Sequence, residues 1–233
     1  MKTPKLIAAC ALITWAAGLS AQNLPVPENV AQLSASGSVE AQQDVLAIAL
    51  NTSASGADAN AVQTQLKQAL DAALAVARPS VQPGQIDLRT GNFSLYPRYD
   101  KVGKINGWQG STELVLEGRD FSRITSVAGK IQTLTIGNVS FALSREQRAK
   151  VEAEAQTIAI DRFKAKAQEV SKSFGFNGYS LREVNINAND QGFQPRGRVM
   201  AMQAKSADAE SAVSVEAGKT TVLVNVSGSV QMR

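Results

Sequence analysis

Alternation of apolar and polar residues predicts six β-strands in this chain. Between residues 107 and 117, Leu114 and Leu116 alternate with Glu113 and Glu117, which is the period of two expected of a strand with one buried face. Glycine, asparagine and proline between the second and third strands favour a hairpin connection. The expected strands cover residues 34–50, 85–96, 107–117, 139–143, 179–187 and 220–230.

Apolar residues spaced by three and four predict three helices between these strands. The first begins at the N-cap Asp58 and ends before Pro79. A short helix covers 120–131. The third is the longest and begins at Ser144, whose hydroxyl forms a capping-box pattern with Gln147. Its expected buried stripe consists of Ala155, Ala159, Phe163, Ala167, Val170 and Phe174.

The order of these elements predicts an α+β fold made of two βαββ-like halves joined by the short helix. We expect mixed or antiparallel sheets packed by the long helix. The last strands of the two halves are alike, Ser111–Gly118 against Thr221–Gly228, although two hydrophobic strands can also match by chance. The predicted boundaries are 34–233 for the domain, about 34–118 and 138–230 for its pseudo-repeats, and 188–218 for a long, partly mobile loop.

The first 21 residues have the three parts of a secretory signal peptide. Two lysines precede an apolar segment over 6–18, and small residues follow it. We therefore expect export to the periplasm, cleavage after Ser20 or Ala21, an N-terminal extension over 22–33, and no transmembrane segment in the mature chain. Ile7–Cys10 resembles the site at which bacterial lipoproteins are cut, an alternative that leaves a shorter apolar segment than usual.

The composition excludes several classes of catalyst. The chain has no histidine, and its single cysteine, Cys10, lies within the leader. Without imidazole or thiolate, the mature protein cannot use Ser-His-Asp or Cys-His catalysis, the usual zinc ligand sets or dithiol redox chemistry. Loss of the two leader lysines leaves a net charge of about +2 with no basic cluster, so we expect no nucleic-acid partner. We predict no catalytic, cofactor-binding or metal-ligating residue and no cofactor.

Several short motifs follow one another in a fixed order along the chain: Ala35–Ala41, Tyr96–Tyr99, Gly107–Trp108, Val139–Ser144 with the alanine-rich helix after it, and Val213–Thr220. Together they resemble the motifs of the SIMPL-domain family, over about residues 33–232. Trp108 stands where that family usually has tyrosine, and Ala217-Gly218 replaces its usual Pro-Gly. The resemblance implies an exported, envelope-associated bacterial protein of a kind often labelled for oxidative-stress defence, with no defining catalytic residues.

The predicted hairpin holds the best candidate for an interaction surface. Tyr96, Arg98, Tyr99 and Trp108 lie close together there, and aromatic residues and arginine concentrate in the hot spots of protein interfaces. The alternative is that these rings pack on their own sheet.

We therefore expect a non-enzymatic periplasmic protein that acts by binding or assembly in envelope or oxidative-stress protection. Its partners would be envelope proteins or further copies of itself. Two alternatives stay open at this point. One is a structural homo-oligomer that forms a shell or channel-like body. The other is a hydrolase that works with carboxylates alone, since glycoside hydrolysis needs only two acidic side chains.

Overall fold

The structure is a computed structural model that describes residues 28–189 and 215–233. Within these ranges it contains three α-helices, one short 3-10 helix and seven β-strands. In chain order they are β1 (Val30–Gln42), β2 (Val45–Gly56), α1 (Ala59–Ala77), η1 (Arg78–Ser80), β3 (Asp87–Tyr99), β4 (Ile105–Gly118), α2 (Phe121–Lys130), β5 (Thr135–Ala142), α3 (Arg145–Ser173), β6 (Tyr179–Asn189) and β7 (Lys219–Met232).

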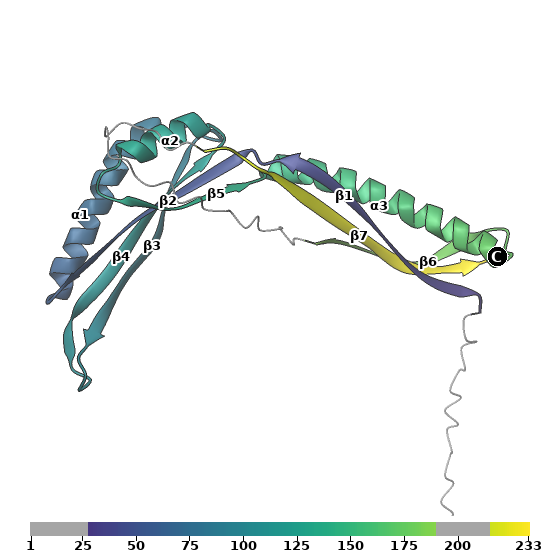
Figure 1. Cartoon of the computed structure of the whole chain (residues 1–233), viewed down its shortest axis with the longest axis horizontal. Helices are drawn as coiled ribbons and strands as arrows, with labels where there is room; N and C mark the ends of the chain where they lie inside the picture. The colour runs from purple at the N-terminus through teal and green to yellow at the C-terminus, as the bar shows by residue number, and fades with distance from the viewer. Residues whose placement is uncertain (1–27, 190–214) are drawn as a thin grey trace, which may run out of the picture.

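The strands form two separate sheets in which every pairing is antiparallel. The strand order is β1-β7-β6 in one sheet and β3-β4-β2-β5 in the other. Figure 1 shows the two sheets end to end, with α3 lying along the first and with α1 and α2 beside the second. The predicted α+β fold, with a long helix packed on a sheet, is confirmed.

One predicted strand is wrong, because residues 34–50 divide into β1 and β2, which enter different sheets. Gln43 and Asp44 alone separate the two strands, and neither is a glycine or proline that would mark a break. The break is held by hydrogen bonds instead: the Gln43 N–H donates to the Gly218 carbonyl and its side-chain amide donates to the Phe141 carbonyl, both over 3.0 Å.

Sheet membership therefore does not follow the predicted repeats 34–118 and 138–230. β1, from the first repeat, pairs with β7 along its whole length, from Val30 opposite Gln231 to Gln42 opposite Lys219. β5, from the second repeat, pairs with β2. Each predicted half contributes one strand to the sheet of the other.

The sheet β3-β4-β2-β5 is covered on one face by α1 and α2. Leu46, Ile48 and Leu50 on β2 and Leu114 and Leu116 on β4 point to that face and are fully buried. Residues two apart on a strand share a face, so the alternation that predicted the strands also built this core.

The sheet β1-β7-β6 is covered by α3 mainly over β1 and β7. Ala155, Ala159, Phe163 and Ala167 are buried against this sheet, as the stripe predicted. Phe174, however, is 70% exposed, because it caps the helix beyond the point where the sheet supports it.

Gly37 allows α3 and β1 to approach closely, since a Cβ at this position would lie 2.1 Å from the Ala155 carbonyl oxygen. Arg162 and Lys166 reach across from α3 to the β1 edge. They donate to the carbonyl oxygens of Ser36 and Ser34 over 2.8 and 3.1 Å. Paired in this way, these carbonyls are not free to join another strand.

Both predicted N-caps are confirmed. Asp58 accepts a hydrogen bond from the Ala61 N–H over 2.8 Å, and Ser144 accepts one from the Gln147 N–H over 3.2 Å. The end of the first helix differs, because Arg78 keeps helical dihedral angles and Pro79 lies inside η1, at a first-turn position where proline is tolerated.

The ends of the chain and the predicted loop are only partly covered by the structure. Residues 30–33 of the predicted N-terminal extension belong to β1. The signal peptide and most of the predicted mobile loop, residues 190–214, lie outside the described residues. No helix in the described part is both long and apolar enough to cross a membrane.

The molecule has two lobes, each made of one sheet and the helices packed on it. A polar network joins them where the chain passes from one sheet to the other. The Asp44 carboxylate accepts hydrogen bonds from the N–H and hydroxyl of Ser144, over 2.6 and 2.7 Å. Arg119, at the end of β4, lies 3.7 Å from Asp44 and also pairs with Glu146 in the first turn of α3. Burial alone would raise the pKa of Asp44, but the Ser144 hydrogen bonds and the Arg119 charge hold that pKa below its usual value.

Asp44→Asn should therefore lower the free energy of unfolding by about 1–3 kcal/mol at neutral pH, because the amide cannot accept both hydrogen bonds. A lowered pKa in the folded state stabilises the protein above the ordinary carboxyl pKa, near pH 4, and this stabilisation is lost as the pH falls through the folded value. Urea denaturation at several pH values should show the two proteins converging in acid. Asp71→Asn, on an exposed position of α1, is the control; a difference independent of pH would contradict this account.

Candidate interaction surface on the β3–β4 hairpin

The β3–β4 hairpin extends beyond the rest of its sheet. The last residue of β2, Gly56, pairs with Trp108, so the part of the hairpin beyond Trp108 has no third strand beside it. Figure 1 shows this two-stranded extension projecting past the end of α1. The four predicted surface residues therefore lie on or next to this two-stranded extension.

Three of those four residues are exposed. Tyr96 and Tyr99 have 60% and 61% of their surface accessible, and Arg98 is exposed as well. Trp108 is only half buried. It packs with Leu95 against a small apolar cluster formed by Ala54 of β2 and by Val62 and Leu66 of α1. The alternative that the rings pack on their own sheet therefore holds for Trp108 only, whereas the other three residues face solvent.

Tyr96 and Arg98 line a shallow pocket on the face of the sheet that the helices leave uncovered. They alternate with Pro97 and lie opposite Gln109 and Gly107 of β4, so they share this face. The pocket has a volume of about 280 Å³. It is lined by Ser53, Ser94, Tyr96, Pro97, Arg98, Gln109, Gly110 and Ser111.

The described lining of this pocket offers hydrogen bonds and one positive charge but no carboxylate. The hydroxyls of Ser94 and Ser111 lie 2.9 Å apart on neighbouring strands. With the phenol of Tyr96, the guanidinium of Arg98 and the amide of Gln109, they can bind a polar or anionic group.

The turn at the end of the hairpin is fixed by Asp100. Its carboxylate accepts hydrogen bonds from the N–H groups of Val102 and Lys104, both over 2.9 Å. Gly103 has φ of 79°, a left-handed conformation that glycine adopts without strain. This geometry places Val102 at the apex with 77% of its surface exposed, and Ile105 beside it with 53% exposed.

Val102, Ile105 and the pocket residues Ser53, Ser94, Gln109 and Ser111 were not predicted from sequence. A signal for Val102 exists: turn positions between an aspartate and a glycine normally carry polar residues, and here one carries valine. The pocket serines and Gln109 gave no such signal, because alternation predicts that they face solvent without saying which strands bring them together.

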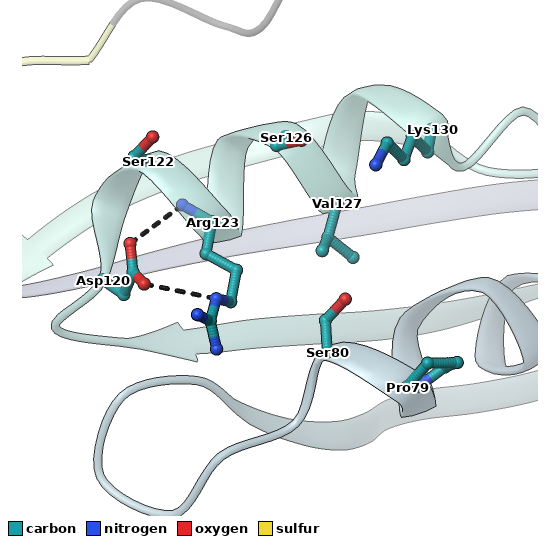
Figure 2. A pocket seen from close by; sticks show the side chains of 8 residues that line it. All are labelled: Pro79, Ser80, Asp120, Ser122, Arg123, Ser126, Val127 and Lys130. Atoms are coloured by element: carbon teal, nitrogen blue, oxygen red, sulfur yellow. Dashed lines mark hydrogen bonds and ion pairs between the residues drawn. The ribbon is translucent and has the colours of Figure 1, made fainter.

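In two other hollows, several of the charged side chains already have partners. Figure 2 shows the larger, of about 470 Å³, between η1 and α2. There the Arg123 guanidinium folds back to Asp120, with Nε 3.3 Å from a carboxylate oxygen, and the Arg123 N–H also donates to Asp120. The charge of Arg123 is thus largely balanced within the helix.

The second of these hollows, of about 360 Å³, bears on the carboxylate hydrolase alternative. It lies beside Arg119 and Ser144, and its lining includes Glu117 and Glu146. Glu117 pairs with Arg89, and Glu146 pairs with Arg119. The N–H of Glu146 and the Arg119 charge lower the pKa of Glu146, which is opposite to the raised pKa that a general acid needs. Among the described residues, no three of the acidic, histidine or cysteine side chains lie together as a metal site would require.

Comparison with known proteins identifies the family. The model of the SIMPL family, described as a protein of unknown function (DUF541), matches residues 31–230. The chain belongs to the SIMPL family. The resemblance stated from the sequence motifs is therefore confirmed, and the match includes both sheets and the β3–β4 hairpin.

Other comparisons add little to the SIMPL match. No curated protein matches the chain significantly. Among solved structures, the crystal structure of AtUAH in complex with glyoxylate matches with 18% sequence identity and a TM-score of 0.27. That match covers 56% of this chain, which spans only 34% of the length of the other chain.

Proposed function

We propose that this SIMPL protein is exported and protects the cell envelope under oxidative stress without catalysing a reaction, by binding a partner through the β3–β4 hairpin. The observation that carries the proposal is the exposure of Tyr96, Arg98 and Tyr99 on a hairpin whose end extends beyond its sheet. Aromatic and arginine side chains contribute the largest share of binding energy at interfaces, and here they are held by a rigid turn.

The composition supports an indirect role in stress protection. Thiol peroxidases need a cysteine of low pKa, and metal-based dismutation normally needs imidazole ligands. The chain has no histidine, and its only cysteine, Cys10, lies in the expected leader. Oxidation of methionine would consume one side chain per oxidant molecule unless a reductase restores it. Protection through a bound partner avoids this limit.

Complementation tests the proposal. Cells that lack the gene should regain resistance to peroxide when they express the wild-type chain, but not when they express Tyr96→Ser/Arg98→Ser. Both side chains are exposed, so the thermal unfolding midpoint of the purified variant should stay unchanged. The intact mass of the protein from the envelope fraction should show the loss of about the first 20 residues, as the signal peptide predicts.

The matched control replaces an exposed aromatic residue and an exposed cation on the other lobe, Phe174→Ser/Lys172→Ser. This variant should protect cells as well as the wild type does. Full protection by the hairpin variant, or sustained peroxide turnover by the pure mature protein, would overturn the proposal.

A further inference from the structure

The tip of the β3–β4 hairpin combines exposed apolar and cationic side chains. Val102 is the most exposed large apolar residue in the described ranges, and Tyr99 and Ile105 flank it with more than half of their surface accessible. Lys101 and Lys104 alternate with them around the turn. Exposing such side chains to water costs free energy, and the fold shows no internal surface on which they could pack.

The cations at the tip are not neutralised by the protein itself. In the described part of the chain, Arg98, Lys101 and Lys104 form no ion pair. The one carboxylate nearby, that of Asp100, is engaged with the N–H groups of the turn. The tip thus has an excess of positive charge around an apolar apex.

We propose that this tip docks the protein onto the surface of an anionic lipid bilayer, with Val102 and Ile105 entering the boundary between headgroups and acyl chains. An apolar apex surrounded by lysine, arginine and tyrosine matches the layered chemistry of that boundary, where tyrosine rings concentrate and cations meet phosphate. The proposal deepens the proposed function, on which it rests, by naming a lipid surface as the partner of the hairpin.

The reach of the hairpin fits this role. The ribbon between Trp108 and the apex has no other strand beside it, and at about 3.3 Å per residue it extends roughly 15–20 Å. An interfacial segment enters a bilayer by only about 5–10 Å. The apex can therefore enter the boundary while α1 and the sheet stay in water.

A soluble protein partner would be expected to cover the pocket beside Tyr96 more than the apex. The pocket includes Tyr96 and Arg98 but none of the residues from Lys101 to Ile105. A valine at the very end of a projecting turn has little surface for a protein to enclose, whereas it can enter a bilayer without a preformed cavity. We therefore favour the bilayer as the occupant of the tip.

Vesicle co-sedimentation with the full mature chain tests the proposal. The wild type should bind vesicles of phosphatidylcholine mixed with phosphatidylglycerol, bind vesicles of phosphatidylcholine alone more weakly, and detach progressively as salt is added. Val102→Ser/Ile105→Ser should lower the partition coefficient at least about tenfold, because two apolar side chains lose their burial. Lys101→Gln/Lys104→Gln should weaken binding and reduce its dependence on salt.

Two control variants on the other lobe should bind as the wild type does. Phe174→Ser removes an exposed aromatic residue, and Lys150→Gln removes an exposed lysine. Equal binding by the tip variants, equal binding to both vesicle types, or no binding by the wild type would overturn the bilayer proposal. If vesicles are not bound while Tyr96→Ser/Arg98→Ser still fails to protect cells, the proposed function stands and its partner is a protein.

Discussion

Phe163→Ala should lower the free energy of unfolding by about 3–5 kcal/mol, the range measured when a buried phenylalanine is truncated. Phe163 is 3% exposed and packs between α3 and the sheet β1-β7-β6, in one cluster with Val224, Val226 and Val230. The other helix residues in this cluster are mainly alanines, so few neighbours can move in to fill the cavity. Urea denaturation followed by far-UV circular dichroism would measure the change.

Phe174→Ala is the matched control for this prediction. It removes the same side chain from the C-terminal end of the same helix, where 70% of the residue is exposed. Its effect should stay within about 0.5 kcal/mol. Comparable losses in the two variants would show that the packing of α3 on its sheet is not the main source of stability in this lobe.

Gly37→Ala should destabilise the same lobe by about 3 kcal/mol, at the upper end of the cost of overpacking. The added Cβ would lie 2.1 Å from the Ala155 carbonyl oxygen and 2.6 Å from the Ala159 nitrogen. Both are backbone atoms of α3, so no side chain can rotate away and the helix itself must shift. Such a shift would also lengthen the hydrogen bonds from Arg162 and Lys166 to β1.

Gly178→Ala provides the control in the same lobe. No heavy atom lies within 4 Å of the position that its Cβ would take, and its backbone φ is not in the left-handed region. We expect a change within about 0.5 kcal/mol, measured by the same denaturation. If Gly37→Ala changes the free energy of unfolding as little as this control does, the close approach of α3 to β1 does not contribute to stability.

Elements defined by local chemistry could be predicted from the sequence. The caps Asp58 and Ser144 were correct because an N-cap depends on one side chain and a backbone N–H three residues later. The hairpin was correct because a glycine, Gly103, marks its turn. The division between β1 and β2 was missed because it is set by partners about 100 and 175 residues away, Phe141 and Gly218.

In the candidate surface, too, features set by nearby residues could be predicted, whereas features set by residues far along the chain could not. The sequence brought Tyr96, Arg98, Tyr99 and Trp108 into one hairpin, but it could not separate Trp108 from the rest. Trp108 is half buried only because α1 and β2 supply an apolar cluster beneath it. Periodicity likewise placed Phe174 in the buried stripe, since a helical pattern does not reveal where the supporting sheet ends.

The pairing of β1 with β7 has a consequence for how the chain folds. β1 begins at Val30 and its partner ends at Met232, so the first strand to be synthesised must wait for the last. Closing a loop of this length is slow, and it has to precede the burial of α3 on a complete sheet. β2 to β5 have all their partners in between and can assemble earlier. Folding should therefore proceed in two stages, and a chain that lost β7 would keep one finished lobe beside a first strand open to aggregation.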